Sequence, residues 1–358
     1  MAIFDRLIAE INLNAIVSNW RRCHDLSGQS TTAAVVKADG YGHGANAVAA
    51  ALYAAGCQVF FTASADEAAL IRPHVGDARI GYFDGLFAGD LDMIREYDLI
   101  PSINDPQQME LLPRLSGGTG LAETMLQLDT GMNRLGIDWR WLTPDTVEKC
   151  LQSSHISLIY SHLSSADDLD SAISKTQLDR FKDAAAIMPD IPASLAASGG
   201  ILRGGDFHFD MVRPGIALYG YPPIPANGFT PALTLKARVL QIRQAKAGEY
   251  VGYNATHQLT RDSVLATIAG GYADGIRRQL GNQGHVRHNA LSAPILGRVS
   301  MDTHVIDITD WPEGMLGMLD YVTILSPDHD ADVMALLSDT ICYDILTSIR
   351  LRAVRAYV

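Results

Sequence analysis

The chain has 358 residues, which exceeds the usual size of one domain and predicts a large domain accompanied by a smaller one. Its formal net charge is -12, from 40 acidic and 28 basic residues, and the basic residues form no dense block. This pattern excludes a surface built for nucleic acid or for anionic lipid. No apolar run reaches the roughly 20 residues of a membrane span, and the opening "MAIFDRLIAEINLN" lacks the apolar core of a signal peptide. A cytoplasmic protein is expected.

The cysteines are few and scattered. Their spacing contains no CxxC pair and supports neither a zinc site nor a disulfide framework, so we expect no metal. We predict that all four are buried free thiols, a common state of free cysteine. They are Cys23, Cys57, Cys150 and Cys342.

The first two thirds of the chain alternate short β-rich apolar runs with alanine- and leucine-rich stretches of helical period, such as "ANAVAAALYAAG" and "ADEAALIRPHV". The alternation favours parallel strands covered by helices. Eight such units in about 220 residues fit a (β/α)8 barrel of the TIM type, and an open doubly wound sheet is the alternative. The predicted strands lie at residues 33–37, 58–62, 79–83, 99–103, 124–128, 156–161, 194–197 and 211–218.

The pattern changes after the stretch "YGYPPIPANGFTP", whose three closely spaced prolines predict a stiff link. Beyond it, segments such as "LTLKARVLQIRQAKAG" and "APILGRVSMDTHVIDIT" are rich in Val, Ile and Thr with period-two alternation. These segments predict a mainly antiparallel β domain. We therefore expect a barrel over residues 1–225, with its first few residues able to pair with the second domain, and a β-rich domain over 226–358.

Five of the eight predicted strands end in polar residues beside glycine. In such barrels the reacting groups lie at the carboxyl ends of the strands and in the loops that follow, so these residues are expected to meet on one face. They are Lys37 before "ADGYGHG", Arg134 in "LDTGMNRLG", His162 in "YSHLSSAD", Ser198 in "AASGG", and Arg213 with Gly215 in "VRPGIALYG".

The residue types at these strand ends suggest a particular cofactor. Ser198 and Gly215 follow strands seven and eight, the usual place for a phosphate in this fold. Lys37 follows an apolar run that would dehydrate its amine, lower its pKa and make it nucleophilic toward an aldehyde. Lysine and phosphate together suggest pyridoxal phosphate. For Lys37 taken alone, the alternative interpretation is a lysine at a solvated strand end. The sequence contains no P-loop motif, which disfavours a nucleotide phosphate.

Eight blocks, in order and over essentially the whole chain, resemble the alanine racemase family. They are "AVVKADGYGHGA", "LDTGMNRLGI", "SHLSSAD", "MVRPGIALYG", "VGYNATH", "GGYADGIRR", "GRVSMDTHVID" and "RLRAVRAYV". The resemblance implies a pyridoxal 5'-phosphate barrel followed by a β domain. It also implies a homodimer with shared active sites that interconverts L-alanine and D-alanine, to supply or to degrade a peptidoglycan precursor.

The resemblance assigns two catalytic bases. Lys37 matches the lysine that binds the cofactor as an aldimine and takes the α-proton of the D-substrate, and Tyr253 of "VGYNATH" matches the base for the L-substrate. Racemisation removes a proton from one face and returns one to the other, so each face needs its own acid or base. By resemblance, His162 and Arg213 form a relay that activates the tyrosine. Read alone, Tyr253 is a strand aromatic packed on a β surface.

Further roles follow from the same resemblance. Arg213 faces the pyridine nitrogen of the cofactor, and because arginine keeps its proton the nitrogen stays neutral, which suits racemisation over transamination. Arg134 contacts the phenolic oxygen near the substrate carboxylate, and the alternative is a loop arginine paired with Asp129. The positions that match phosphate ligands are Tyr41, Ser198, Gly215, Ile216 and Tyr343. The positions that border the substrate or its access corridor are Met301 and Asp302, from the partner chain, and Tyr272.

Two positions depart from the family pattern. Gln127 stands where many members carry a carbamylated lysine that orients the arginine matching Arg134, and Ala197 stands where an asparagine is usual. A glutamine accepts a hydrogen bond but brings no charge, so Arg134 is expected to rely on another anion or to be held less firmly.

Three other activities compete with alanine racemisation. A serine or broader-specificity racemase of the same family differs only in the substrate pocket. A fold-related pyridoxal-phosphate decarboxylase would need a catalytic cysteine with an acidic partner, and Cys342 is expected to lack one. A non-catalytic carrier of the cofactor would consist of a barrel alone.

Overall fold

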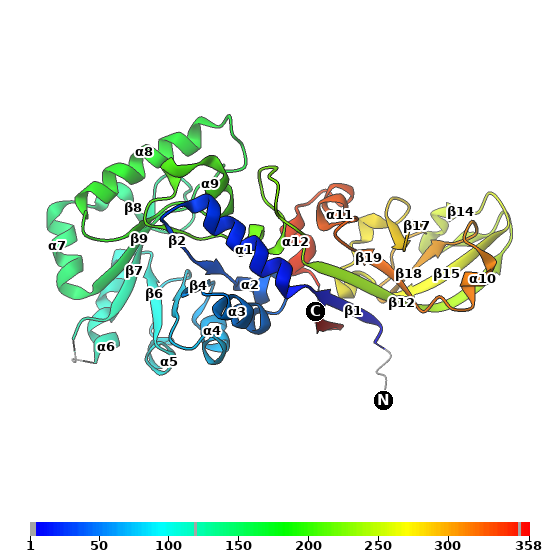
Figure 1. Ribbon diagram of the computed structural model, residues 1–358, viewed down its shortest axis with the longest axis horizontal. Helices are drawn as coiled ribbons and strands as arrows, with labels where there is room; N and C mark the ends of the chain where they lie inside the picture. The colour runs from blue at the N-terminus through cyan, green and yellow to red at the C-terminus, as the bar shows by residue number, and fades with distance from the viewer. Residues whose placement is uncertain (1–4, 118–119, 350–351) are drawn as a thin grey trace. The chain divides into compact units, whose positions relative to one another are not determined.

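The computed structural model describes residues 5–117, 120–349 and 352–358 (Figure 1). Contacts divide the chain into two compact units. The barrel unit comprises residues 15–40 and 45–230. The β unit comprises the N-terminal segment through residue 14, residues 41–44 and the chain from residue 231 onward.

Parallel strands form the barrel unit, and each pairs with the next along the chain. Seven strands follow one another in the order β3-β4-β5-β6-β7-β9-β10, with β8 (Ile137–Asp138) attached to β7. They are β3 (Ala34–Val35), β4 (Val59–Thr62), β5 (Arg79–Tyr82), β6 (Leu99–Ile103), β7 (Glu123–Asp129), β9 (His155–Tyr160) and β10 (Ala193–Ser194).

An eighth strand closes this sheet. Strand β2 (Thr31–Thr32) pairs in parallel with β11 (Met211–Val212), and the Ala33 and Val35 amides continue the ladder to the carbonyls of Val212 and Pro214. On its other side, the Arg213 amide donates to the Ala196 carbonyl beyond β10. The predicted (β/α)8 arrangement is therefore confirmed, with β2 and β3 together forming its first strand.

Several predicted strands end earlier than expected, and β10, predicted to reach residue 197, ends at Ser194. Residues 216–218 belong to the 3-10 helix η5 (Ile216–Tyr219), because Pro214 has no amide proton to extend the ladder. Lys37 begins the turn α2 (Lys37–Tyr41), and the last ladder bond of that strand runs from the Val36 amide to the Phe61 carbonyl.

Helices follow the strands, and several begin at a residue whose side chain caps the first turn. Ser64 caps α4, Ser171 caps α8, and Thr143 forms a capping box at α7, so the first free amides of these helices are satisfied. The helices are α1 (Leu13–Ser27), α3 (Ala45–Ala54), α4 (Ala65–Ile71), α5 (Leu91–Tyr97), α6 (Leu112–Ser116), α7 (Pro144–Ser153), α8 (Ala172–Ile187) and α9 (Ser198–Arg203). The short 3-10 helices are η1 (Arg72–His74), η2 (Pro106–Leu111), η3 (Trp139–Trp141) and η4 (Gly205–Phe207).

The β unit is built on one sheet of order β15-β18-β17-β16-β19-β12-β1-β20. All its pairs are antiparallel except that of β1 with β20, which confirms the mainly antiparallel domain. The strands are β1 (Leu7–Ile11), β12 (Leu233–Ala245), β15 (Ser263–Ala269), β16 (His285–His288), β17 (Leu291–Leu296), β18 (Thr303–Asp307), β19 (Tyr321–Leu325) and β20 (Ala353–Tyr357). Its helices are α10 (Glu313–Leu316), α11 (Ala331–Leu337) and α12 (Cys342–Thr347), with η7 (Tyr272–Asp274) and η8 (Arg278–Leu280).

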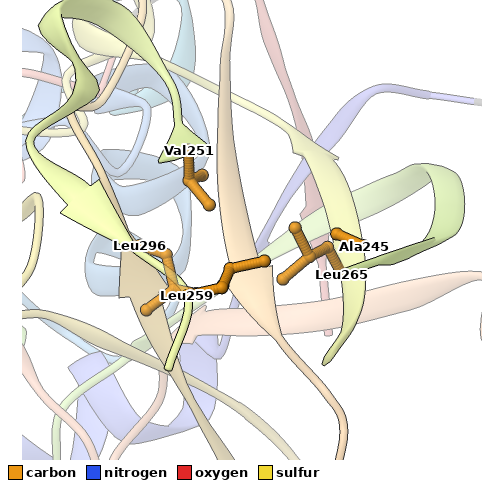
Figure 2. Close-up of a cluster of buried hydrophobic side chains, with 5 residues drawn as sticks. All are labelled: Ala245, Val251, Leu259, Leu265 and Leu296. Carbon is orange, nitrogen blue, oxygen red and sulfur yellow. The ribbon is translucent and has the colours of Figure 1, made fainter. Parts of the chain in front are cut away.

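A small cluster of buried aliphatic side chains supports the hairpin of β13 (Tyr250–Val251) and β14 (His257–Gln258) (Figure 2). Burying a leucine or valine in such a cluster stabilises the fold by about 1.5–3 kcal/mol, so the hairpin is anchored although it has only one ladder. The cluster consists of Ala245, Val251, Leu259, Leu265 and Leu296, with Val305 packed against it.

The described residues include no helix that is both long and apolar enough to cross a membrane. All four cysteines are buried and free, as predicted.

Candidate active site

The chain turns through an unusual left-handed segment directly after Lys37. Ala38, Asp39, Gly40 and Tyr41 have φ angles of 53°, 54°, 62° and 51°. Residues with a Cβ adopt this conformation at a cost of roughly 1–2 kcal/mol each, so surrounding contacts must hold the turn. Within the barrel unit, the Gly40 amide donates to the Val36 carbonyl at 2.8 Å. The turn thereby ends the first strand and presents the lysine.

The Lys37 amine lies partly buried at the strand end, with Nζ 5.9 Å from the centre of the Phe83 ring. Burial lowers its pKa most, and the positive charge of Arg134 lowers it further. The carboxylates of Glu67 and Asp84 act in the opposite direction. A lysine with a lowered pKa holds more of its amine in the neutral, nucleophilic form, as the sequence predicts.

His162 lies near the same amine. Burial, together with the nearby positive charges of Arg213, Arg134 and Lys37, lowers its pKa to about 3. The imidazole is therefore neutral at physiological pH. These mutual effects show that the structure brings the four predicted basic residues of the barrel unit to one place.

Arg213 is buried and has no carboxylate partner among the ion pairs of the described residues. Its guanidinium donates to the Ser194 hydroxyl and, at 2.7 Å, to the Ser161 carbonyl, and it lies 4.9 Å from the centre of the Tyr160 ring. Burial lowers its pKa to about 10, so it remains protonated at neutral pH. A buried guanidinium whose partners are neutral still has N–H groups that can donate hydrogen bonds to a ligand.

Ser198 and the start of η5 form a polar cradle. The Ser198 hydroxyl oxygen accepts bonds from the amides of Gly215 at 3.0 Å and Ala217 at 3.2 Å, and Ile216 lies between them. A hydroxyl that accepts two bonds still has its proton to donate, so the cradle suits an anion such as phosphate. Ala197, just before Ser198, gives α9 no side-chain cap.

The loop that carries Arg134 is organised by Asp129. The Asp129 carboxylate accepts bonds from the amides of Gly131 at 2.8 Å and Met132 at 2.9 Å. Arg134 itself is exposed, and the ion pairs of the described residues include none between it and Asp129. The alternative in which Asp129 pairs with the Arg134 guanidinium is therefore wrong, because the carboxylate satisfies backbone amides instead.

Gln127 is held in a neutral network beneath this loop. Its amide oxygen accepts from the Tyr160 hydroxyl at 2.9 Å, and its nitrogen donates to the Leu135 carbonyl at 3.2 Å. The Tyr160 oxygen also pairs with the Ser102 hydroxyl at 2.7 Å. Gln127 thus supports the residue next to Arg134 and supplies no charge.

Tyr253 lies on the 3-10 turn η6 (Tyr253–Ala255), between Gly252 and Asn254, which both have positive φ angles. Its side chain is 70% exposed, so it is not an aromatic packed on the sheet. Within the β unit, the ring of Tyr343 on α12 lies 6.2 Å from that of Tyr41.

The structure also brings together the residues that the sequence predicted to border the substrate or its access corridor. The Tyr272 amide donates to the Ser300 carbonyl, and the Ala273 amide donates to the Met301 carbonyl, both at 3.0 Å. The Met301 side chain is 53% exposed and is not a core residue. Asp302 forms a 2.7 Å ion pair with Arg352.

Sequence reasoning missed two charged residues beside these groups. Arg352 bridges Asp302 and, at 2.6 Å, the buried Asp274, and no local pattern in the sequence indicated it. Glu67 is bonded to the turn after Lys37, and the spacing of Ser64 and Glu67, which is that of a capping box, could have directed attention to it.

The expectation that Cys342 has no acidic neighbour is wrong, because α11 places Asp332 beside it. Burial, together with the charge and hydrogen bond of Asp332, raises the pKa of the Cys342 thiol to about 12. A thiol in this state is a poor nucleophile. The cysteine therefore does not support the decarboxylase alternative.

A parallel barrel whose strand ends carry a lysine of lowered pKa and a cradle for an anion is typical of enzymes that bind a phosphorylated carbonyl compound through an amine. Comparison with known proteins narrows this class. The model of the alanine racemase N-terminal domain matches residues 11–223, and that of the alanine racemase C-terminal domain matches residues 232–357. The chain belongs to the alanine racemase family.

Individual relatives agree over nearly full length. An alanine racemase of Rhizobium meliloti is 38% identical and is aligned over 97% of this chain and 96% of its own. The crystal structure of alanine racemase from Bartonella henselae with covalently bound pyridoxal phosphate is 35% identical, with a TM-score of 0.90 over 99% of both chains. The biosynthetic alanine racemase from Pseudomonas aeruginosa is 32% identical, with a TM-score of 0.87 over 99% of both chains.

Proposed function

We propose that this protein is an alanine racemase that interconverts L-alanine and D-alanine with pyridoxal 5'-phosphate. The observation that carries the proposal is the cluster in which His162 lies near the Lys37 amine, whose pKa burial lowers, and near the buried Arg213 guanidinium. The Ser198 cradle follows a strand of the same barrel. Similarity to alanine racemases over nearly the whole chain supports it. The product would serve peptidoglycan synthesis, or the reaction would degrade D-alanine.

The residues of the barrel unit fit the cofactor. Lys37 would hold it covalently, and the Ser198 hydroxyl with the amides of Gly215 and Ile216 would bind its phosphate. Tyr41 and Tyr343 are proposed as further phosphate ligands, and Arg213 would donate to the ring nitrogen while retaining its own proton. When bound, pyridoxal phosphate draws electrons from the α-carbon of the amino acid and so acidifies the α-proton.

Two residues would then move the proton on opposite faces of the α-carbon. The Lys37 amine would take it from D-alanine and return it to form that isomer, and the Tyr253 phenolic oxygen would do the same for L-alanine. His162 and Arg213 would support the charge change on the tyrosine, since the neutral imidazole can accept a bond and the guanidinium supplies positive charge.

The remaining predicted residues would select the substrate. Arg134 would receive the carboxylate, Met301 and Asp302 of a second copy of the chain would border a small pocket, and Tyr272 would lie in its access corridor. We propose that two copies of the chain form a homodimer with shared active sites. A serine or broader-specificity racemase is the second candidate, because the uncharged Gln127 leaves Arg134 without an acidic partner among the described residues.

Exchange of the α-proton in deuterated water tests the reaction and the substrate together. Each L-amino acid is incubated with the protein, and α-deuterium and chirality are followed by NMR spectroscopy and chiral chromatography. We expect L-alanine to exchange and racemise fastest. A faster reaction with serine would identify the second candidate, and loss of carbon dioxide without racemisation would contradict the proposal.

Tyr253→Phe separates the two bases in the same assay. Because the two mirror-image isomers have equal free energy, any variant must keep kcat/KM equal in the two directions, so exchange rather than net racemisation is informative. We expect D-alanine to keep exchanging its α-proton through Lys37 while exchange from L-alanine is lost. Equal loss of exchange from both isomers would contradict separate bases.

A further inference from the structure

Glu67 joins the turn after Lys37 to the neighbouring strand end. Its carboxylate oxygen Oε1 accepts the Ala38 amide at 2.8 Å, and Oε2 accepts the Ala63 amide at 2.9 Å. Ala38 is the first residue of the left-handed segment, and Ala63 directly follows β4. One side chain thus uses both of its oxygens to fix two backbone segments relative to each other.

The position of Glu67 in its helix makes this use of the carboxylate unusual. Glu67 is the third residue of α4, and its own amide donates to the Ser64 hydroxyl that caps the helix, at 3.4 Å. In a capping box the glutamate would turn back to the amide of the capping residue. Here the carboxylate bonds to the residue before the cap and to the lysine turn instead.

A turn with this geometry needs such a partner. Ala38 and Asp39 both carry a Cβ in the left-handed region, so the segment would relax toward ordinary conformations without external bonds. The bond from the Ala38 amide acts at the residue next to Lys37. It therefore fixes the backbone from which the lysine side chain leaves the strand.

We propose that Glu67 is a positioning residue for Lys37, which holds the left-handed turn against the end of β4 so that the amine is preorganised for the carbonyl of the cofactor. The inference rests on the proposed function, since it names a residue that prepares the same lysine. Glu67 does not touch the reacting atoms in this role and acts through the backbone of Ala38.

Glu67 also contributes charge at this place. The groups that act electrostatically with the Lys37 amine come from several elements: Glu67 on α4, Asp84 after β5, Arg134 after β7 and His162 after β9. Removing the Glu67 charge leaves Asp84 as the remaining carboxylate of this set. The effect of the two Glu67 hydrogen bonds and the effect of the Glu67 charge can therefore be separated by replacing Glu67 with different side chains.

The test measures capture of pyridoxal phosphate by the full chain freed of cofactor, followed as the rise of visible absorbance in stopped flow. We expect Glu67→Ala to capture the cofactor about tenfold more slowly than the unaltered protein, because both hydrogen bonds to the turn are lost. Glu67→Asp keeps the charge but is one methylene shorter, so it should also be slow. Its pH profile should remain that of the unaltered protein.

Glu67→Gln has the shape of glutamate without the charge and presents an NH2 group to one of the two amides. We expect slower capture and, in addition, an acid limb of the rate that moves to lower pH, because a charge that raises the pKa of Lys37 is gone. An unchanged pH profile in this variant would show that the Glu67 carboxylate does not affect the pKa of the Lys37 amine.

Ser64→Ala is the matched control, because it removes the cap of the same helix and leaves the bonds of the Glu67 carboxylate in place. It should lower stability while leaving the capture rate within about twofold of the unaltered protein. The proposal is overturned if Glu67→Ala captures the cofactor at the unaltered rate, or if Ser64→Ala slows capture as much. Failure of the unaltered protein to capture pyridoxal phosphate would instead overturn the proposed function.

Discussion

At Lys37, burial and the positive charge of Arg134 lower the pKa of the amine, while the carboxylates of Glu67 and Asp84 raise it. The sequence predicts the burial, because the run 33–36 is apolar and ends at the lysine. It does not predict the left-handed turn, because Ala38 and Asp39 are residues that normally avoid positive φ. The bonds that hold the turn include the long-range bond from the Ala38 amide to Glu67, and a bond of this kind leaves no periodic signal in the sequence.

His304 offers a test of burial at the level of one side chain. It lies buried on β18, where Nδ1 donates to the Gly270 carbonyl at 2.7 Å, and burial lowers its pKa to about 4. As the pH falls below 6.5 the unfolded chain binds a proton that the folded chain excludes until about pH 4. Stability is therefore lost between these two pH values.

We expect His304→Gln, which does not titrate, to reduce the loss of unfolding free energy between pH 7 and pH 5 by about 2 kcal/mol relative to the unaltered protein. Urea denaturation at the two pH values measures this difference. His155→Gln, at an exposed position on β9, serves as the control and should change the dependence little. A pH dependence that is the same in His304→Gln and the unaltered protein would contradict the assignment.

At the scale of elements, Arg352 connects η7 with the segment before β18. Its guanidinium bonds to Asp274 at 2.6 Å and to Asp302 at 2.7 Å, and the Asp274 side chain is only 3% exposed. The Gly271 amide supplies the other bond to Asp274, at 3.0 Å. The sequence indicated Tyr272 and Asp302 as candidate site residues. It did not indicate the ion pair of Arg352 with Asp274 that lies beside them.

Replacing Arg352 by Gln should destabilise the protein by about 1–3 kcal/mol, because a buried carboxylate loses its cation. The added substitution Asp274→Asn should recover part of this loss, since a neutral amide needs no cation. Urea denaturation of both variants checks the coupling. Arg261→Gln is the control, since it removes a bidentate pair with the exposed Asp310 and should cost less than about 1 kcal/mol. Equal losses at the two arginines would contradict this account.

At the scale of the whole molecule, periodicity in the sequence predicted the eight parallel strands and the mainly antiparallel sheet. We expected the first few residues to be able to pair with the second domain, but the place of β1 between β12 and β20 could not be predicted. Its partners, such as Ala237 and Ala353 for Leu7, lie far along the chain. The domain boundary near residue 225 remains a prediction. For the site, residues at strand ends were accessible to sequence reasoning, whereas supporting residues such as Glu67 were not, because tertiary contacts alone define them.

Tyr253 bears on how many chains form one active site. An aromatic side chain that is 70% exposed on a turn with positive φ angles is poorly placed for the packing of its own unit. In the proposed homodimer with shared active sites, Tyr253 would complete the site of a second copy, opposite Lys37. In a two-fold symmetric dimer, each copy would then give its Tyr253 and receive that of its partner.

Mixing two inactive variants tests this arrangement. If Lys37→Ala and Tyr253→Phe are combined in equal amounts and their subunits are allowed to exchange, half of the dimers contain one chain of each kind. Each mixed dimer then has one site with both substitutions and one with neither, so about a quarter of the activity of the unaltered protein should return. Either variant mixed with itself is the control. Absence of any recovery, once mass spectrometry has shown that mixed dimers form, would mean that Lys37 and Tyr253 act within one chain.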